Sequence, residues 1–388
     1  NPICHNLLNR GAIGNHQGSL HLAEATVTSV PRSSARGAPE TGYGSRSYRN
    51  YILGILLTVY IFNFIDRTII NILTEPIKES FGVEDWQMGL LGGPAFAILY
   101  TFVGIPIARF SEKHHRVWII AGSVFLWSLM TVLCGFATSF IALFIFRIGV
   151  SIGEAGCSPP ANSLIADYFP PHQRARALGI PLGGMVAYVF GGYIVGSLDG
   201  PIIGALLASW NWTWAVNALD WQNIEGWRVA FAVVGVPGLI VAAIVKLTIA
   251  EPPRGYTDPA EMQNREQVGF REVLRILSQK PAYWHVTMGV TIASFVNYGV
   301  GQFFVSFLIR THELSIFDAS VKIAMALAVM AAIGTYMSGY LADRYAQRFP
   351  KALALIPMFA LIGVIPMHVT GYLAESLWLA VPLMMVGQ

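Results

Sequence analysis

The strongest constraint on this chain of 388 residues is a series of long apolar stretches. A helix that crosses a bilayer needs about 20 mostly apolar residues, because its backbone polar groups must find partners inside the segment. Only 12% of the residues are charged, against about a quarter in an ordinary soluble domain. We therefore expect an all-α integral membrane protein. The predicted spans cover residues 51–73, 87–109, 116–137, 140–167, 174–198, 229–250, 283–309, 319–342, 352–373 and 376–388.

Two polar regions divide the chain into parts. Residues 1–50 are rich in Gly, Ser, Pro and Arg and lack an apolar run, which predicts a disordered cytoplasmic tail. A polar linker over residues 251–282 follows the sixth predicted span. This pattern predicts an N-terminal six-helix bundle over 51–250 and a C-terminal bundle over 283–388. The second bundle is expected to be incomplete, because the last apolar run stops in mid-span.

The linker contains apolar residues at helical spacing. They occupy one face of a possible helix, with the charged residues elsewhere on its surface. We interpret this segment as an amphipathic helix on the cytoplasmic membrane surface, with a partner-binding helix as the alternative. The apolar residues are Val268, Phe270, Val273, Leu274 and Leu277.

Basic residues are distributed unevenly between the two sides of the predicted spans, which sets the orientation because basic loops stay in the cytoplasm. With the N-terminus inside, the external side holds only Lys78, Arg228, Arg310 and Lys322. The cytoplasmic side holds Arg46, Arg49, Arg109, Lys113, Arg116, Arg174, Arg176, Arg254, Arg265, Arg271, Arg275, Lys280, Arg344, Arg348 and Lys351. The N-terminus is therefore predicted to be cytoplasmic.

Five tryptophans lie between the fifth and sixth predicted spans. Tryptophan favours membrane–water interfaces because its ring is amphipathic. This segment is interpreted as an external interfacial loop, with a ligand-stacking box as the alternative. The residues are Trp210, Trp212, Trp214, Trp221 and Trp227.

Several classes of function lack their sequence signals. The formal net charge of +3 is too small to indicate a nucleic-acid partner, and the three cysteines form neither a CxxC site nor a disulfide framework. The metal-protease and phosphate-loop motifs (HExxH and GxxxxGK[ST]) are missing from the sequence, and the one match to the serine-hydrolase motif GxSxG, at residues 149–153, lies inside an apolar predicted span. We therefore expect no enzyme activity and no cofactor, and energy from a proton gradient or from the substrate's own concentration.

An internal repeat links the two predicted bundles. The second span ends in "GIPIARFSEKHHR" and the eighth in "GYLADRYAQRFPK", so that Gly104 and Arg109 align with Gly339 and Arg344 at one offset. Related halves of six helices are typical of secondary transporters.

These motifs resemble those of the major facilitator superfamily, whose loop between the second and third helices of each half is similar to "GYLADR". Three other stretches resemble the Spinster branch: "NFIDRTIINILTEPI", "WQMGLLGGPAFAILY" and residues 146–180. The resemblance covers about residues 51–388. It implies two related six-helix bundles, transport by alternating access, and a lysophospholipid or sphingolipid as substrate. Two features depart from the family: Ala108 replaces the usual acid of the first loop motif, and the last two of twelve helices are absent.

Four charged residues lie deep inside the first and fourth predicted spans. Asp66 and Arg67 are adjacent in "YIFNFIDRTIINIL", and Arg147 and Glu154 are seven residues apart, on one face of a helix. Asp66 lies roughly 22 Å along the first span, at nearly the level of Arg147, with Glu154 nearer the midplane. Because the resemblance places the first and fourth helices at the central cavity, we expect these residues to meet there.

Ionisable residues inside a membrane are rare and usually pair or line a water-filled path. We interpret Asp66 or Glu154 as a proton carrier whose proton affinity changes when Arg67 or Arg147 approaches or withdraws. Arg67 is expected to stabilise Asp66 in one state. The alternative is a permanent network that only holds helices together.

The fourth span contains two features that shape its backbone. Gly149 and Gly153 have the GxxxG spacing that lets another helix approach closely. The following Ser-Pro-Pro at residues 158–160 is expected to interrupt the helix, since proline lacks the backbone donor.

The resemblance also assigns a cytoplasmic gate and a substrate cavity. The basic gate residues could instead be ordinary membrane anchors, and the aromatic cavity residues could instead face lipid. The predicted gate consists of Gly104, Arg109, Asp167, Arg174, Arg176, Gly339, Asp343 and Arg344. The predicted cavity consists of Phe62, Asn63, Phe64, Phe295, Asn297, Tyr298, Gln302 and Phe303.

An apolar cavity with few polar groups suits a small amphiphilic substrate with one charged or zwitterionic head. The main alternative is a proton-coupled symporter of a sugar acid or other organic anion, which needs Arg67 or Arg147 free to bind the substrate. The other alternative is a non-transporting receptor or a subunit completed by a partner. We expect a monomer in the cell (inner) membrane.

Overall fold

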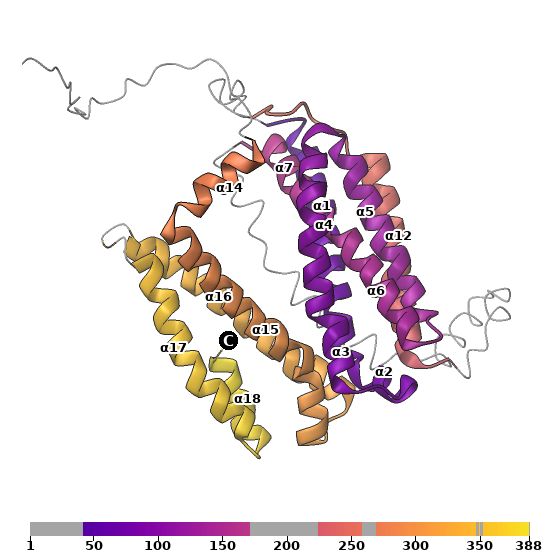
Figure 1. Ribbon diagram of the computed structural model, residues 1–388, viewed down its shortest axis with the longest axis vertical. Helices are drawn as coiled ribbons and strands as arrows, with labels where there is room; N and C mark the ends of the chain where they lie inside the picture. The colour runs from indigo at the N-terminus through magenta and orange to yellow at the C-terminus, as the bar shows by residue number, and fades with distance from the viewer. Residues whose placement is uncertain (1–41, 171–223, 258–268, 347–348, 350–351, 388) are drawn as a thin grey trace, which may run out of the picture. The chain divides into compact units, whose positions relative to one another are not determined.

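The computed structural model describes residues 42–170, 224–257, 269–346, 349 and 352–387 (Figure 1). Every regular element among these residues is a helix, so the all-α class is confirmed. The predicted tail lies outside the described residues up to residue 41, and the first helix begins at Arg46 rather than at Tyr51. The predicted fifth span, with Arg174 and Arg176, also lies outside them.

Helices occupy the predicted spans throughout the described part of the chain. The first part forms α1 (Arg46–Ile72), α2 (Thr74–Phe81), α3 (Asp85–Gly92), α4 (Pro94–Lys113), α5 (Arg116–Gly135), α6 (Phe140–Ala155), α7 (Ser158–Tyr168) and α12 (Gly226–Thr248). The second part forms α14 (Phe270–Ser278), α15 (Pro281–His312), the π-helix η1 (Asp318–Ala324), α16 (Met325–Ala346), α17 (Ala352–Leu373) and α18 (Leu377–Val386). The predicted linker helix is thus present as α14.

Local sequence explains where several helices begin. The side chains of Ser45 and Ser139 accept hydrogen bonds from the backbone N–H groups of Tyr48 and Ala142, each at 3.2 Å. Such caps satisfy donors that have no partner in the first turn of α1 and α6. Helices α4, α7 and α15 begin with proline in the first turn, where its missing N–H costs nothing.

Two predicted spans are interrupted. The fourth breaks between α6 and α7 at Gly156 and Cys157, just before the Ser-Pro-Pro that predicts this break. The second breaks at Gly93, between α3 and α4, which the sequence analysis did not anticipate. A Cβ at Gly93 would lie 2.8 Å from the carbonyl oxygen of Gly89, so this break requires glycine.

Six helical stretches in the described part of the chain are long and apolar enough to cross a membrane. They are Arg46–Ile72, Asp85–Lys113, Arg116–Gly135, Phe140–Tyr168, Gly226–Thr248 and Pro281–His312. Their outer surfaces carry large apolar side chains, including Phe102, Ile141 and Leu247, which are 73%, 70% and 80% exposed. Such surfaces suit contact with lipid rather than with water.

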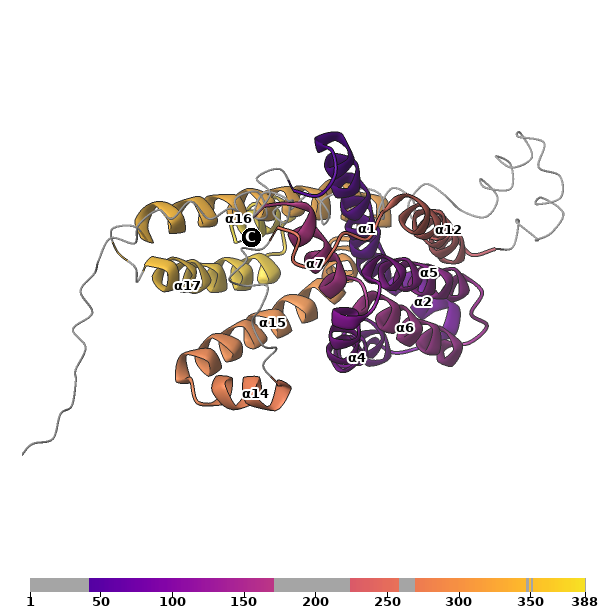
Figure 2. The ribbon, with the colours of Figure 1, turned by 90° about the horizontal axis from the view of Figure 1, so that it is seen from above.

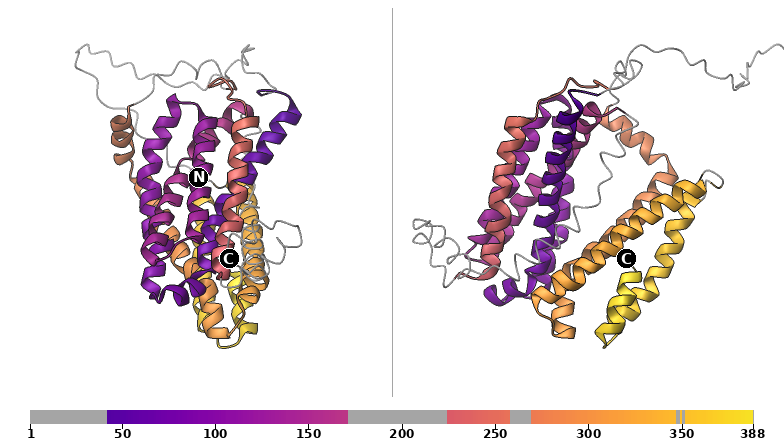
Figure 3. Two further views of the ribbon diagram at one scale, coloured as in Figure 1. Left: turned by 90° about the vertical axis from the view of Figure 1, so that its right-hand side faces the viewer. Right: turned by 180° about the vertical axis from the view of Figure 1, so that it is seen from behind.

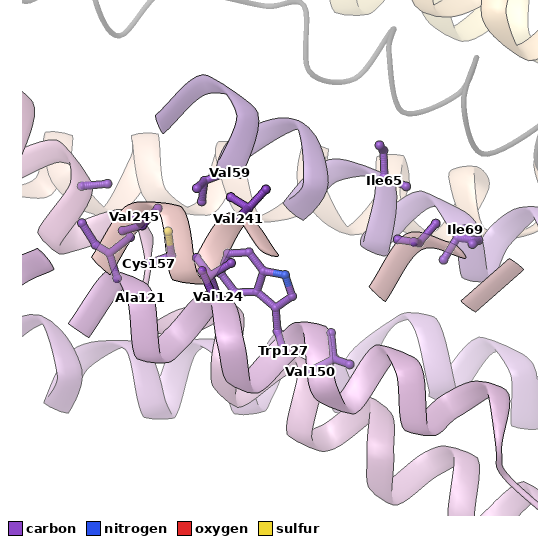
Figure 4. Packing of buried hydrophobic residues seen from close by; sticks show 14 of the residues in the cluster. Val59, Ile65, Ile69, Ala121, Val124, Trp127, Val150, Cys157, Val241 and Val245 are labelled. Atoms are coloured by element: carbon purple, nitrogen blue, oxygen red, sulfur yellow. The ribbon is translucent and has the colours of Figure 1, made fainter. Parts of the chain in front are cut away.

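Helices α1, α4, α5, α6 and α12 form one bundle. Helix α5 packs against α6 and α12, α6 packs against α4, and α1 packs against α12 (Figures 2 and 3). The core between them includes the fully buried Trp127 of α5, with Val59 of α1, Val150 of α6 and Val241 of α12 around it (Figure 4).

The predicted close approach at the GxxxG spacing is confirmed, and the partner is α5. A Cβ on Gly153 would lie 2.6 Å from the backbone nitrogen of Trp127, and one on Gly149 would lie 2.7 Å from Met130. Glycine at both positions therefore brings α6 against α5. This contact sets the position of Glu154, the next residue on α6.

The interfacial interpretation of the tryptophan-rich segment is wrong for Trp227. Helix α12 begins at Gly226, and Trp227 is 2% exposed, with its ring against Phe81 at 5.5 Å and Phe231 at 6.1 Å. Its side chain packs inside the bundle because the helix starts earlier than predicted. The other four tryptophans lie outside the described residues.

Candidate functional site

The four intramembrane charges form two ion pairs between α1 and α6, which we call the central cluster (Asp66, Arg67, Arg147 and Glu154). Arg147 Nη1 lies 3.3 Å from Asp66 Oδ1, and Arg67 Nε donates to Glu154 Oε2 at 2.6 Å. Asp66, Arg147 and Glu154 are at most 3% exposed. Neighbouring residues on α1 are therefore paired with residues two turns apart on α6.

Helix α5 completes the surroundings of Asp66. Thr131 Oγ1 donates a hydrogen bond to Asp66 Oδ2, and Arg147 Nη1 also donates to the Asp66 backbone carbonyl at 3.2 Å. Thr131 is fully buried. Asp66 therefore connects three helices, and removing its charge would change contacts on α5 as well as on α6.

Helix α4 contributes aromatic rings to both arginines. The Arg67 guanidinium lies 4.8 Å from the ring centroid of Tyr100 and 5.4 Å from that of Phe96, and the Arg147 guanidinium lies 5.5 Å from Phe96. These distances fall within the range of cation–π attraction. The two cations of the central cluster thus share one ring.

Two polar atoms of the central cluster have no hydrogen-bond partner among the described residues. They are Glu154 Oε1 and Arg147 Nε, both buried. Asn63 of α1 lies within interaction range of Glu154, and Tyr298 of α15 lies within electrostatic range of Arg67. The cluster therefore retains capacity for a proton or a new partner.

The predicted meeting of the first and fourth spans agrees with this geometry, but one pairing differs. We expected Arg67 to stabilise its neighbour Asp66, whereas in this structure Arg147 pairs with Asp66 and Arg67 with Glu154. Successive residues of a helix point about 100° apart, so Asp66 and Arg67 face different parts of α6.

The predicted cavity residues lie in different surroundings. Phe62 packs against the core of the first bundle, Phe295 is 77% exposed, and Tyr298 is 57% exposed. Asn63 is half-buried, while Phe64 and Asn297 are exposed. Exposed aromatic and amide groups at this level of α15 are compatible with a substrate surface.

Gln302 and Phe303, in contrast, pack against the first part of the chain. Gln302 is 4% exposed and donates to Thr74 Oγ1 at 3.3 Å. A Cβ on Gly92 would lie 1.9 Å from Gln302 Oε1, and one on Gly89 would lie 3.5 Å from the Phe303 ring. In this conformation, both side chains fill a helix contact between α15 and α2–α3 rather than line a cavity.

An ion-pair network at the end of α15 was missed by the sequence analysis. Arg310 donates to Glu75 at 2.6 Å and to Asp85 at 2.7 and 2.8 Å, and Lys78 also binds Asp85. We call these four residues the Arg310 network. It joins α15 to α2 and α3 at the end predicted to be external.

A second missed network surrounds Arg116 at the start of α5. Its Nε donates to Glu251 at 2.5 Å, Nη2 to the Pro252 carbonyl at 3.0 Å, and Nη1 to Asp167 and to both oxygens of Ser163. Arg116 is 1% exposed. We call Arg116, Ser163, Asp167 and Glu251 the Arg116 network.

The Arg116 network explains the surroundings of one predicted gate residue. Asp167 is buried, pairs with Arg116, and accepts a hydrogen bond from the Gly255 backbone at 2.9 Å. The segment after α12 is further held by Arg254, which donates to the carbonyls of Ser111 and His114 at 2.8 and 2.6 Å. Asp167 therefore ties α7 to α5 and to the end of α12.

The remaining gate residues that the structure describes lie on α4 and α16. Arg109 is exposed near the end of α4, and a Cβ on Gly104 would lie 3.9 Å from Ala155, where α4 and α6 are close. Arg344 is exposed in the last turn of α16 and donates to the Tyr340 hydroxyl at 3.0 Å. Gly339 and Asp343 also lie on α16, and Arg174 and Arg176 fall outside the described residues.

The missed residues had only weak sequence signals. Arg116 and Arg310 lie at the ends of apolar runs, where basic residues are typical membrane anchors. The Glu-Pro-Pro-Arg that follows the sixth span was a usable signal, because an acid at a basic membrane edge needs a partner.

The chain belongs to the Major Facilitator Superfamily, whose family model matches residues 56–388. The chain also matches the crystal structure of a bacterial homologue of the human lysosomal transporter Spinster, in an inward-facing, unoccupied conformation. The sequences are 43% identical, with a TM-score of 0.81 over 89% of this chain and 73% of the other. Within the superfamily it is therefore a transporter of the Spinster branch, not an enzyme.

Two curated relatives support this placement. An MFS-type efflux pump of Mycolicibacterium smegmatis is 29% identical over 85% of this chain and 70% of its own length. Protein spinster of Drosophila melanogaster is 27% identical over 82% of this chain. The chain spans about half (49%) of the length of the Drosophila protein. The match over many apolar helices makes it a multi-pass membrane protein.

Proposed function

We propose that this chain is the transport core of a proton-coupled carrier that moves a lysolipid-like or sphingolipid-like amphiphile by alternating access. The observation that carries the proposal is the central cluster, where two carboxylates and two guanidiniums are buried between α1 and α6. Burying charges costs desolvation free energy, so two such pairs are poor devices for stability alone. Their presence is better explained by a change of charge during the transport cycle.

Proton binding would act directly on the helix contacts. A proton from water would convert the Glu154 or Asp66 carboxylate into a neutral acid, and the attraction to Arg67 or Arg147 would weaken. Because Asp66 also accepts from Thr131, its protonation would loosen α1 from both α5 and α6. A carrier that binds its proton in one conformation and releases it in the other can exchange it for a substrate.

The substrate class rests on the surface of α15 and on the relatives. Phe295 and Tyr298 expose aromatic rings, with Asn297 beside them and Tyr298 in electrostatic range of Arg67. Such a surface suits an acyl chain with a polar head. The resemblance to the Spinster branch implies the same class of substrate.

The organic-anion alternative receives less support from this geometry. It requires Arg67 or Arg147 free to bind a carboxylate, whereas each is engaged with a carboxylate of the protein. A substrate carboxylate would have to displace Glu154 from Arg67 or Asp66 from Arg147, and both of these acids are buried.

The orientation and location form part of the proposal. A cytoplasmic N-terminus places α14 and the Arg116 network on the cytoplasmic side, in agreement with the distribution of basic residues. The Arg310 network then closes the external side. The proposed carrier is a monomer in the cell (inner) membrane and needs no cofactor other than the proton gradient.

The test is transport in proteoliposomes, with labelled lysophospholipid and a labelled sugar acid compared in the presence and absence of a pH gradient. The parent is expected to move the lysolipid faster with the gradient, and Asp66→Asn or Glu154→Gln to lose that stimulation. Gradient-driven sugar-acid transport would support the alternative. Coupling that survives in both variants would leave the central cluster with a structural role only.

A further inference from the structure

Phe96 of α4 is the one ring that both arginines of the central cluster approach among the described contacts. Its centroid lies 5.4 Å from the Arg67 guanidinium and 5.5 Å from that of Arg147. Phe96 belongs to neither ion pair and comes from a different helix. An uncharged ring therefore lies near both ion pairs.

The position of this ring is fixed from two sides. Ser151 of α6 donates to the Phe96 backbone carbonyl at 2.8 Å, and the Phe96 ring stacks on Tyr100 with centroids 6.2 Å apart. Ser151 is fully buried. The hydrogen bond ties the backbone of Phe96 to the helix that carries Arg147 and Glu154, so the ring is held near both arginines.

Protonation of a carboxylate would leave its arginine without a charged partner, and the Phe96 ring lies where it can interact with that arginine. The neutral acid no longer balances its arginine, and a guanidinium in a water-poor interior needs another partner. The negative face of an aromatic ring attracts a cation without taking up a proton. Phe96 is within reach of either arginine, and Tyr100 at 4.8 Å offers Arg67 a second ring.

We propose that Phe96 is a positioning residue that holds the arginine released when Asp66 or Glu154 takes up a proton. The ring stabilises the protonated state of the cluster and keeps the freed guanidinium close enough to return when the proton leaves. This inference rests on the proposed proton coupling. It assigns a role in proton coupling to a residue that has no titratable group.

Charged and titratable groups from several helices interact with one another in and around the central cluster. Their contributions must be separated in any pH experiment. They are Tyr60, Asp66 and Arg67 on α1, Tyr100 on α4, Cys134 on α5, Arg147 and Glu154 on α6, Cys157 after α6, and Tyr298 on α15.

The experiment measures carboxyl protonation directly, without a substrate. Infrared difference spectra of the purified protein are recorded against pH, and Asp66→Asn and Glu154→Gln assign the carboxyl bands. Phe96 is then replaced by phenylalanines with increasing fluorination, which weakens the ring's attraction for cations at nearly constant shape. The midpoint of the carboxyl titration is expected to move to lower pH, by roughly half a pH unit for the fully fluorinated ring.

The outcomes separate this inference from the function on which it rests. A parent in which neither carboxyl titrates would overturn proton coupling itself. A parent that titrates, with a midpoint that fluorination leaves unchanged or moves to higher pH, would overturn only the role of Phe96. Fluorination of Phe231, which is buried against Trp227, controls for effects of fluorine on folding and should leave the midpoint in place.

Discussion

The central cluster and the Arg116 network both bury arginine against carboxylates, yet they differ in how completely the donors and acceptors are used. All three side-chain nitrogens of Arg116 donate to acceptors on α7 and on the segment after α12. In the central cluster, Arg147 Nε and Glu154 Oε1 have no partner among the described residues. A saturated network resists change, whereas an unsaturated one can accept a proton or exchange partners.

Replacing Arg116 by alanine should have the largest effect on stability. The change leaves Asp167 and Glu251 without their shared cation, and breaking a buried pair costs about 3–5 kcal/mol. Unfolding of the detergent-solubilised protein would measure this loss. Arg275→Ala, at a side chain that is 72% exposed, is the matched control and should stay within about 0.5 kcal/mol of the parent. Equal effects of the two variants would contradict a structural role for the Arg116 network.

Gly153→Ala should also lower stability, because it pushes α6 away from α5 and displaces Glu154. The added Cβ would lie 2.6 Å from backbone of Trp127, and overpacking of this kind costs about 1–3 kcal/mol. Gly122→Ala on α5 is the control, since no heavy atom lies within 4 Å of its Cβ position. That variant should be more stable than the parent by about 0.5–1 kcal/mol. Unfolding measurements on both variants decide the matter, and an unchanged Gly153→Ala would argue against the tight contact.

The pair Glu154→Gln and Asp167→Asn compares the two regions with the same chemical change. Both changes remove the negative charge of a buried ion pair, but the amide at 154 can still accept from Arg67, so the loss of stability at 154 is expected to be the smaller of the two. The amide at 167 must present its NH₂ group to Arg116 or to the Gly255 backbone, both donors, so the loss should be about 1–3 kcal/mol larger. Unfolding in detergent measures both. A larger loss of stability in Glu154→Gln than in Asp167→Asn would contradict the view that the Arg116 network is the saturated one of the two.

Arg310→Gln should have the smallest effect on stability, less than about 1 kcal/mol, because Arg310 and Asp85 are 39% and 48% exposed. It should nevertheless open the end of α15 against α3. A cysteine at Gly89, next to Phe303, would then react faster with a membrane-impermeant thiol reagent, measured in a Cys4→Ser background. Arg310→Lys, which keeps a positive charge opposite Glu75 and Asp85, should keep labelling slow. An unchanged labelling rate in Arg310→Gln would contradict the proposed closure of the external side by the Arg310 network.

The sequence predicted the helices well because apolar length and charge depletion are local properties. It also predicted which four charged residues meet, because charged residues inside apolar helices usually pair with one another. It did not predict how they pair. Asp66 and Arg67 differ by about 1.5 Å in depth and about 100° in direction, so pairing depends on the rotation of α1 about its axis. That rotation is set by tertiary packing rather than by local sequence.

The residues that the sequence analysis missed share a different cause. Arg116 resembles any basic residue at a cytoplasmic membrane edge, and only folding brings Asp167 and Glu251 to it from far along the chain. Gln302 looked like a cavity residue because it is polar in an apolar helix, and its real partner, Thr74, lies on a short helix after the first span. Long-range partners of this kind have no signature in spacing or composition.

The interruption at Gly93 divides the second predicted span into two helices that contact different parts of the molecule. On one side of it, α3 carries Asp85, Gly89 and Gly92, which contact α15. On the other side, α4 carries Phe96, whose backbone is fastened to α6 through Ser151. The hydrogen bonds of the two helices meet at Gly93, whose N–H donates to the Gly89 carbonyl at 3.0 Å and whose carbonyl accepts from the Ala97 N–H at 3.0 Å. A tilt of α3 together with α15 can therefore be accommodated at Gly93 without moving Phe96 relative to the central cluster.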